Sequence, residues 1–285
     1  SLDDDNLKYA MLAANLYFQD AAVKNDMDLL AKGIEVAKAA LEYPDARDIP
    51  GPKQNAANMF RNVFYRYLAK CYVEQAVYAK ENNEEELEAS TIQNAEEMVY
   101  NIKQLIKADD IVFQKWDGLV AMIKGDKTAA VRNLYNAQQL LKTRERSDPF
   151  VSYYLSQLLN GRNEIGARQE FLSDALINKY GNPDFSSIAN TKPEAMLDYA
   201  ESLLRLGQYE GSKSIADIYN ERYTPNTRSK SILIHCDINS GSFDDAVMKI
   251  ADLGAESSVI ANLELSLMNR RISKTKQELR EAENS

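Results

Sequence analysis

The densest group of reactive side chains is the His-Cys-Asp run at 235–237, which on paper supplies a base, a nucleophile and an acid. The surrounding residues predict a helix over 226–240, where successive side chains point about 100° apart. The three groups therefore cannot converge on one another. His235 is the only histidine, and the sequence has no Cys-x-x-Cys pair, so a metal site cannot be completed. We expect structural or surface roles for these residues.

Other signatures of catalysis or cofactor binding are missing from the sequence. There is no Gly-x-Ser-x-Gly elbow, no glycine-rich phosphate loop and no His-Glu-x-x-His motif. The aspartates at 3–5 could attract a cation, but they lack the spaced ligands and glycine turn of a calcium loop. We expect them to charge a helix N-terminus instead. We predict no catalytic, cofactor-binding or metal-binding residues. An enzyme stays the third alternative, since it would need carboxylates that converge from separate segments.

Composition limits the class of partner. The chain of 285 residues has a formal net charge of −9, which argues against nucleic acid or an anionic membrane surface as the main partner. No apolar run approaches the ~20 residues of a membrane span. The chain begins at Ser1 rather than Met, so a removed leader or anchor stays open, and with it a cytoplasmic or a periplasmic (envelope) location. We expect Cys71 and Cys236 to be small buried residues, with a disulfide or a reactive thiol as the alternative.

Apolar residues recur at helical spacing along almost the whole chain. The only candidate strand, at 231–234, lies inside a helical pattern. The proline-containing stretch 43–54 reads as a connector. An acidic run at 81–97 is either a solvated helix face or a docking patch for a basic partner. Helices are predicted at 3–22, 27–42, 53–82, 84–107, 110–124, 127–142, 148–160, 163–180, 192–206, 209–222, 226–240, 243–253 and from about 256.

One local pattern recurs in the second half of the chain. LGQYEGS at 206–212 has a counterpart 34 residues later in SGSFDDA at 240–246, and KGDKTAA at 124–130 and NGRNEIG at 160–166 have the same shape. In each, a glycine ends the first helix in the left-handed conformation, and a small residue lets the second helix approach closely. The insertion 181–193 reads as a loop. The turn glycines are Gly125, Gly161, Gly207 and Gly241, and the small positions are Ala130, Gly166, Ser212 and Ala246.

A 34-residue period, a helix–turn–helix unit and the LG-x-Y turn resemble the tetratricopeptide repeat (TPR) family. The resemblance is specific over 112–254 and weaker before that. Tyr154 and Ile234 depart from it, because they stand where the family prefers glycine or another small residue. The matching residues are Gly118, Ala121, Ala130, Leu134 and Ala137 in one unit, and Ala200, Leu203, Gly207, Tyr209 and Ser212 in another.

The resemblance implies an all-α fold, a right-handed α-α superhelix of about six helical hairpins plus a C-terminal capping helix. Such hairpins cannot bury their apolar faces alone, so copies must stack. We predict one TPR-like domain over 1–285, with aberrant hairpins at 1–107, TPR-like repeats at 108–254, and a capping helix and charged tail at 255–285. A last helix that continues into further chain is the alternative to a cap.

In TPR arrays the first helix of each pair lines the concave face, where the family binds peptides. The asparagine and lysine pairs of chaperone-binding members are not reproduced, which argues against recognition of a chaperone tail. The predicted helix 148–160 is apolar nearly all round, so it is either buried on every side or presents a stripe to a partner. The resemblance implies a groove lined by Lys115, Leu119, Met122, Ile123, Val151, Leu155, Leu158, Leu159, Leu197, Glu201, Arg205, His235 and Asn239.

We therefore predict a non-enzymatic scaffold or adaptor that binds a protein or peptide in this groove, with an apolar floor, a polar rim and no cofactor. The alternative is a structural subunit of a larger assembly, for example at a bacterial envelope, that binds through its convex face or its ends. Exposure of Leu119, Ile123, Leu155 and Leu159 would favour the groove, and their burial would count against it. The oligomeric state is not predicted.

Overall fold

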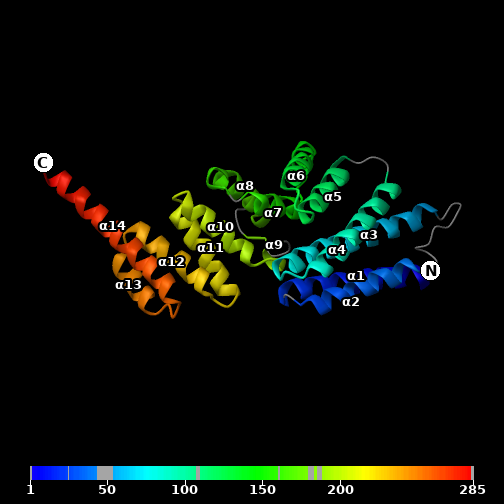
Figure 1. Ribbon diagram of the computed structural model, residues 1–285, viewed down its shortest axis with the longest axis horizontal. Coiled ribbons are helices and arrows are strands. Elements are labelled where there is room, and N and C mark those ends of the chain that lie inside the picture. Colours follow the sequence, from blue (N-terminus) through cyan, green and yellow to red (C-terminus); the bar gives the residue numbers. More distant parts are fainter. Residues whose placement is uncertain are drawn as a thin grey trace. The chain divides into compact units, whose positions relative to one another are not determined.

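The computed structural model describes residues 2–24, 26–43, 54–106, 110–159, 161–178, 183–184 and 188–283. These residues are almost entirely helical, and the one extended pairing among them is an antiparallel bridge between Ile177 and Pro183. The predicted all-α fold of stacked helical hairpins is confirmed. The chain divides into two compact units, 1–158 and 159–285, a boundary that the sequence did not indicate. We describe each unit by itself (Figure 1).

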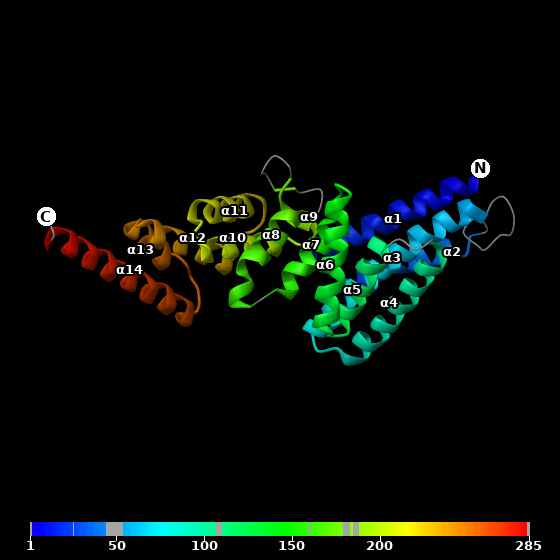
Figure 2. The same cartoon turned by 90° about the horizontal axis from the view of Figure 1, so that it is seen from above.

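The first unit is built of helices that pair in chain order. Helix α1 packs on α2, α3 on α4 and α5 on α6, and α7 packs on α6 (Figure 2). Helix α3 also contacts α1, α2 and α5, which makes it the central helix of the unit. The bounds are α1 Leu2–Lys24, α2 Met27–Leu41, α3 Gln54–Glu81, α4 Glu85–Leu105, α5 Asp110–Ile123, α6 Lys127–Thr143 and α7 Pro149–Leu158.

Local signals in the sequence account for where these helices begin and approach one another. The carboxylate of Asp26 caps α2 by accepting hydrogen bonds from the amides of Asp28 and Leu29. Asp126 caps α6 by accepting from the amide of Ala129. Between α5 and α6 the close approach depends on Gly118, where an added Cβ would lie 2.6 Å from Cγ of Leu134. The small family position at 118 therefore has a packing reason.

The second unit repeats the hairpin plan. Helix α10 packs on α11 and α12 on α13, while α8 packs on α9 and α10. Helix α14 packs on both α12 and α13. The bounds are η2 Arg162–Glu164 (one 3-10 turn), α8 Ile165–Leu176, α9 Ile188–Thr191, α10 Glu194–Arg205, α11 Tyr209–Arg222, α12 Thr227–Ser240, α13 Phe243–Ala251 and α14 Ser257–Glu283.

Three of the four predicted repeat turns have the expected geometry. Gly125, Gly207 and Gly241 have φ of 81°, 77° and 87°, and the small residues that follow them, Ala130, Ser212 and Ala246, are fully buried. The prediction of the fourth turn, at Gly161, is wrong. Gly161 has a φ of −72° and precedes a 3-10 turn, and Gly166 is exposed with no atom near its missing Cβ. Helix α7 belongs to the first unit and α8 to the second, so the pair predicted around Gly161 is divided between them.

Further boundaries differ from the sequence predictions. The expected loop 181–193 contains the short helix α9, which Ile188 and Ala189 anchor by burial. The expected connector 43–54 lies mostly outside the described residues, as do the side chains of the aspartates at 3–5. Both cysteines are buried free thiols, as predicted.

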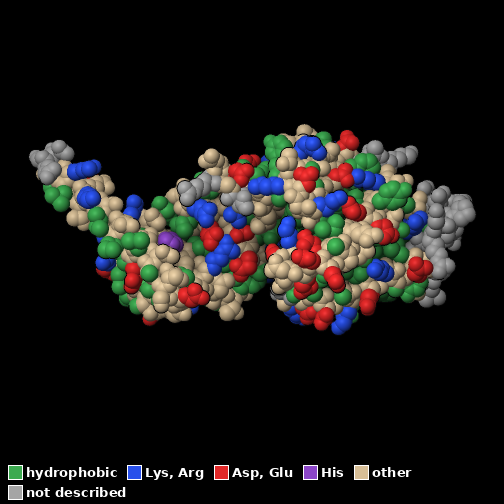
Figure 3. Space-filling view, viewed as in Figure 1, with side chains coloured by type: hydrophobic (Ala, Val, Ile, Leu, Met, Phe, Trp, Pro, Cys, Tyr) green, Lys and Arg blue, Asp and Glu red, His purple; other side chains and the backbone are tan. Residues whose placement is uncertain are grey.

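Helix α14 both closes the second unit and extends beyond it. Leu263 and Leu267 are buried in a cluster with Ile234, Ile250 and Leu253. Contrary to the prediction that the helix fades into a charged tail, it stays helical to Glu283. Its second half extends past α12 and α13, and it shows hydrophobic and basic side chains on the face in view (Figure 3).

Candidate functional site

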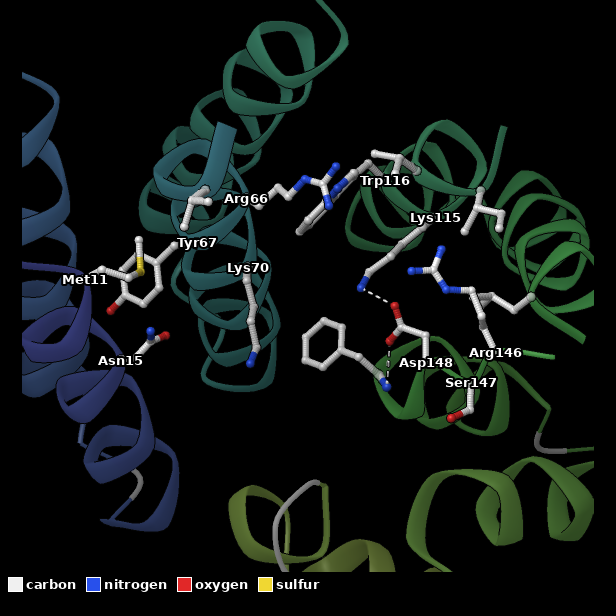
Figure 4. A pocket seen from close by; sticks show the side chains of 15 residues that line it. Met11, Asn15, Arg66, Tyr67, Lys70, Lys115, Trp116, Arg146, Ser147 and Asp148 are labelled. Carbon is white, nitrogen blue, oxygen red and sulfur yellow. Dashed lines mark hydrogen bonds and ion pairs between the residues drawn. The ribbon is translucent and has the colours of Figure 1, made fainter. Parts of the chain in front are cut away.

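A cavity of about 760 Å³ opens in the first unit where α1, α3, α5 and the start of α7 come together (Figure 4). Helices α1, α3 and α5 are the first helices of successive hairpins, and α7 follows the last of these hairpins. It is lined by Met11, Asn15, Val63, Arg66, Tyr67, Lys70, Ile111, Val112, Lys115, Trp116, Leu141, Arg146, Ser147, Asp148 and Phe150.

The cavity is basic although the chain is acidic. Four cations, Arg66, Lys70, Lys115 and Arg146, face a single carboxylate, that of Asp148, which leaves an excess of three positive charges (4 − 1). The whole chain has a net charge of −9. A partly enclosed site with low-dielectric walls focuses such a field, so the cavity attracts anionic groups.

Asp148 fixes one wall of the cavity. One carboxylate oxygen accepts a hydrogen bond from Nζ of Lys115 at 2.6 Å. The other accepts from the amides of Phe150 and Val151 at 3.1 and 3.3 Å, which caps the N-terminus of α7 (Figure 4). Asp148 therefore positions the Lys115 ammonium at the cavity and caps α7 at the same time.

Lys70 holds its ammonium between aromatic rings. Its Nζ lies 3.9 Å from the ring centroid of Phe18 and 5.0 Å from that of Phe150. Burial lowers the pKa of Lys70, and the negative charge of Glu74 opposes this shift. Within the part of the chain that the structure describes, Lys70 has no salt bridge. An anion that enters the cavity would add a direct ion pair to the longer-range attraction of Glu74 and Asp148.

A buried hydrogen bond supports this wall from behind. The hydroxyl of Tyr154 on α7 donates to Glu74 of α3 at 2.7 Å. Burial, reinforced by the charge of Glu74, raises the pKa of Tyr154 well above its usual value, so the hydroxyl remains a neutral donor. Tyr154 is one of the two departures from the TPR pattern. Its large side chain is explained by this bond, which a glycine could not make.

Most of the apolar residues predicted to line a groove are core residues. Internal packing covers them, so they cannot form the floor of a binding groove in this structure, and the prediction of an apolar floor is wrong. The buried residues are Leu119, Ile123, Val151, Leu155 and Leu197, each at most 4% exposed. Met122, Leu158 and Leu159 are half-buried.

Lys115 is the one predicted groove residue that lines the cavity. The remaining polar residues of the predicted groove come from the second unit and have local roles where contacts are seen. Glu201 accepts hydrogen bonds from the guanidinium of Arg228 at 2.7 and 2.8 Å. Asn239 donates to the backbone carbonyl of His235 at 2.8 Å, and Arg205 is exposed.

The His-Cys-Asp run has the structural roles expected of it. Asp237 is buried and bridges Lys213 and Lys249 at 3.0 and 2.5 Å. Burial alone would raise the pKa of Asp237, but the hydrogen bonds from the two lysines lower it below its usual value. Burial raises the pKa of the Cys236 thiol, which disfavours the reactive thiolate. Among the described residues, no three His, Cys, Asp or Glu side chains gather as a metal site.

The sequence contained a weak signal for the cavity that we did not use. Arg66 and Lys70 are four residues apart and flank Tyr67, so they share one face of the long helix α3. Asp148 directly precedes Pro149, an arrangement typical of a helix start. Nothing in the sequence marks Arg146, because it comes from the segment between α6 and α7.

Comparison with solved structures finds similarity to PilF of Pseudomonas aeruginosa, with a TM-score of 0.54 and 14% sequence identity. The match covers 93% of this chain and 99% of that chain. At this identity the similarity shows the fold alone. No protein-family model matches the sequence, and no curated protein matches it either. None of the described helices is long and apolar enough to cross a membrane.

Proposed function

We propose that the protein is a non-enzymatic scaffold or adaptor that binds an extended segment of a partner protein in the cavity of the first unit. The observation that carries this proposal is the cluster of four cations beside aromatic rings, in a chain that is otherwise acidic. The ligand class that fits is a peptide segment with Asp or Glu next to an apolar side chain. Its carboxylate pairs with Lys70 and Arg146, and its apolar group packs on Trp116 and Phe150.

A peptide fits this site better than a nucleic acid does. The four cations of this cluster line a single cavity, whereas a nucleic acid needs an extended basic surface to neutralise successive phosphates. The net charge of −9 on the whole chain also disfavours binding of such a polyanion. The proposed binding site thus differs from the groove that the sequence predicted, because its lining is basic and aromatic rather than apolar.

The test uses a phage-displayed library of random peptides, selected on the full-length protein. We expect the enriched peptides to contain Asp or Glu beside an apolar residue. A synthetic peptide from this set is then titrated while the fluorescence of Trp116 is followed. Trp116 is the only tryptophan and lines the cavity, so it reports binding there.

Two charge reversals of equal size make the result specific. Arg146→Glu, at the cavity, should raise the dissociation constant of the peptide about tenfold, which is a loss of about 1.4 kcal/mol of binding free energy. Lys32→Glu, on the exposed side of α2, should leave it unchanged. The proposal is wrong if no peptide is enriched, if the enriched peptides lack acidic residues, or if both variants bind as the original protein does.

A further inference from the structure

Helix α14 has apolar side chains on two opposite sides. Leu263 and Leu267 form the inner side and are buried against α12 and α13. A helix that only closes an array is expected to be polar on its outer side. In α14 the outer side carries a second row, each member 46–56% exposed, and helical geometry places it opposite the first. This outer stripe consists of Leu265, Met268, Ile272 and Leu279.

The outer stripe lies largely on a part of the helix that has little other packing. All residues from 268 to 282 are exposed, and in both views this part extends past α12 and α13 (Figures 1 and 2). A free helix of this length is only marginally stable in water, because packing of an apolar face supplies most helical stability in proteins. A partner that covers the outer stripe would therefore stabilise α14.

The spacing of the outer stripe fits another helix. Its members are separated by three, four and seven residues, which is the narrow seam of a heptad repeat. Helices that lie on membranes have a broader apolar face, rich in Trp, Phe or Leu. Helix α14 contains no aromatic residue.

The charges beside the outer stripe indicate the character of that helix. Between 268 and 282 there are five basic and two acidic residues, a net charge of +3 (5 − 2). Arg271 and Lys276 flank Ile272 at the two positions that face a coiled-coil partner. A parallel second copy would set Arg271 of one chain against Lys276 of the other, which is repulsive. Glutamate or aspartate at the matching positions of a different helix would be attractive.

We infer that the outer stripe of α14 binds an amphipathic helix of a partner protein whose own apolar seam is flanked by acidic residues. The two helices form a coiled coil at this end of the second unit. This surface is separate from the cavity of the first unit and does not depend on the function proposed for it. The existing contacts of Arg271 are long: it lies 3.7 Å from Asp244, whose side chain is fully exposed, and 5.6 Å from the ring centroid of Phe243.

The experiment titrates the full-length protein with two designed helical peptides that share a leucine seam and differ only in their flanking residues. One peptide carries glutamate at these positions and the other lysine. We expect the glutamate peptide to bind at least about tenfold more tightly. In the double variant Arg271→Glu and Lys276→Glu the order should reverse. The matched control, Lys230→Glu with Arg205→Glu, changes net charge equally at other exposed sites and should keep the original order.

A second variant separates the apolar contribution from the charges. Ile272→Asp with Leu279→Asp alters only exposed positions, so the protein should fold, as circular dichroism can verify, yet bind neither peptide. Equal binding of both peptides, or an order that the charge swap does not reverse, would overturn the inference. So would a dimer of the protein alone that Ile272→Asp dissolves, seen by light scattering. Binding to phosphatidylglycerol vesicles that the same variant abolishes would instead assign the stripe to a lipid surface.

Discussion

Lys115 and Asp148 lie 33 residues apart, and their ion pair joins helix α5 to the start of helix α7 at 2.6 Å. The same carboxylate caps α7, so a single side chain positions a cavity lysine and begins the helix that forms the adjoining wall. The two roles can be separated by substitution, because asparagine keeps the cap and loses the charge.

Asp148→Asn should lower the free energy of unfolding of the first unit by up to about 1 kcal/mol, because only the partly exposed ion pair is lost. Asp148→Ala also removes the cap and should lower it by about 1 kcal/mol more. Urea denaturation followed at Trp116 reports the first unit and measures both. Equal effects of the two substitutions would show that the cap contributes nothing.

Tyr154→Phe should destabilise the first unit by about 1–3 kcal/mol, because the buried Glu74 carboxylate loses its donor at 2.7 Å. The control is Tyr223→Phe, which removes a hydroxyl that donates to Ala189 in the second unit. The control should leave the Trp116 unfolding curve unchanged. An unchanged midpoint for Tyr154→Phe would mean that water or another group replaces the bond.

Gly118→Ala should destabilise the protein, although alanine is the better helix former. The new Cβ would lie 2.6 Å from Cγ and 3.0 Å from the backbone nitrogen of Leu134, and such overpacking costs about 1–3 kcal/mol. Gly166→Ala is the matched change in open space and should be neutral or stabilise by up to about 1 kcal/mol. Thermal unfolding by circular dichroism compares the two, and a loss of stability in Gly166→Ala alone would contradict this account.

His235 should make the second unit less stable as the pH falls from about 7.5 to about 5.5. Burial lowers the pKa of His235 below 6.5. As the pH falls through this range, the unfolded chain therefore binds a proton at His235 more readily than the folded chain does. One proton limits the slope to about 1.4 kcal/mol per pH unit. His235 is the only histidine, so His235→Asn should flatten the dependence in this window. Denaturation measured at both pH values by circular dichroism tests this, and a slope that survives the substitution would assign it to another group.

The helices and most of their pairing could be predicted because their signals are local. Helix α11 begins and ends where expected, at Tyr209 and Arg222, since Gly207 fixes the turn before it. The prediction at Gly161 and Gly166 was wrong because the short sequence pattern is present there, but no other helix among the described residues packs closely against Gly166. The division into two units was missed for the same reason, since it depends on contacts between helices.

The cavity could not be predicted because its residues come from helices that are distant in the sequence. The helical pattern marked Leu119 and Leu155 as members of first helices, but it could not show that they point into the core. Successive side chains on a helix point about 100° apart, so a buried position and an exposed position can be only one or two residues apart in the sequence. Only the packed structure shows that Lys115 reaches the cavity while Leu119 and Leu155 are buried in the core.

The bond between Tyr154 and Glu74 also bears on how the first unit unfolds. In a repeat array each hairpin contacts only its neighbours, so the end hairpins can detach one at a time. Here the residues are 80 positions apart, and α4, α5 and α6 lie between their helices in the chain. When α7 detaches, it removes a donor from a buried carboxylate in the central helix α3. The first unit should therefore melt in a single cooperative transition, and this long-range contact should slow its folding relative to an array of purely local contacts.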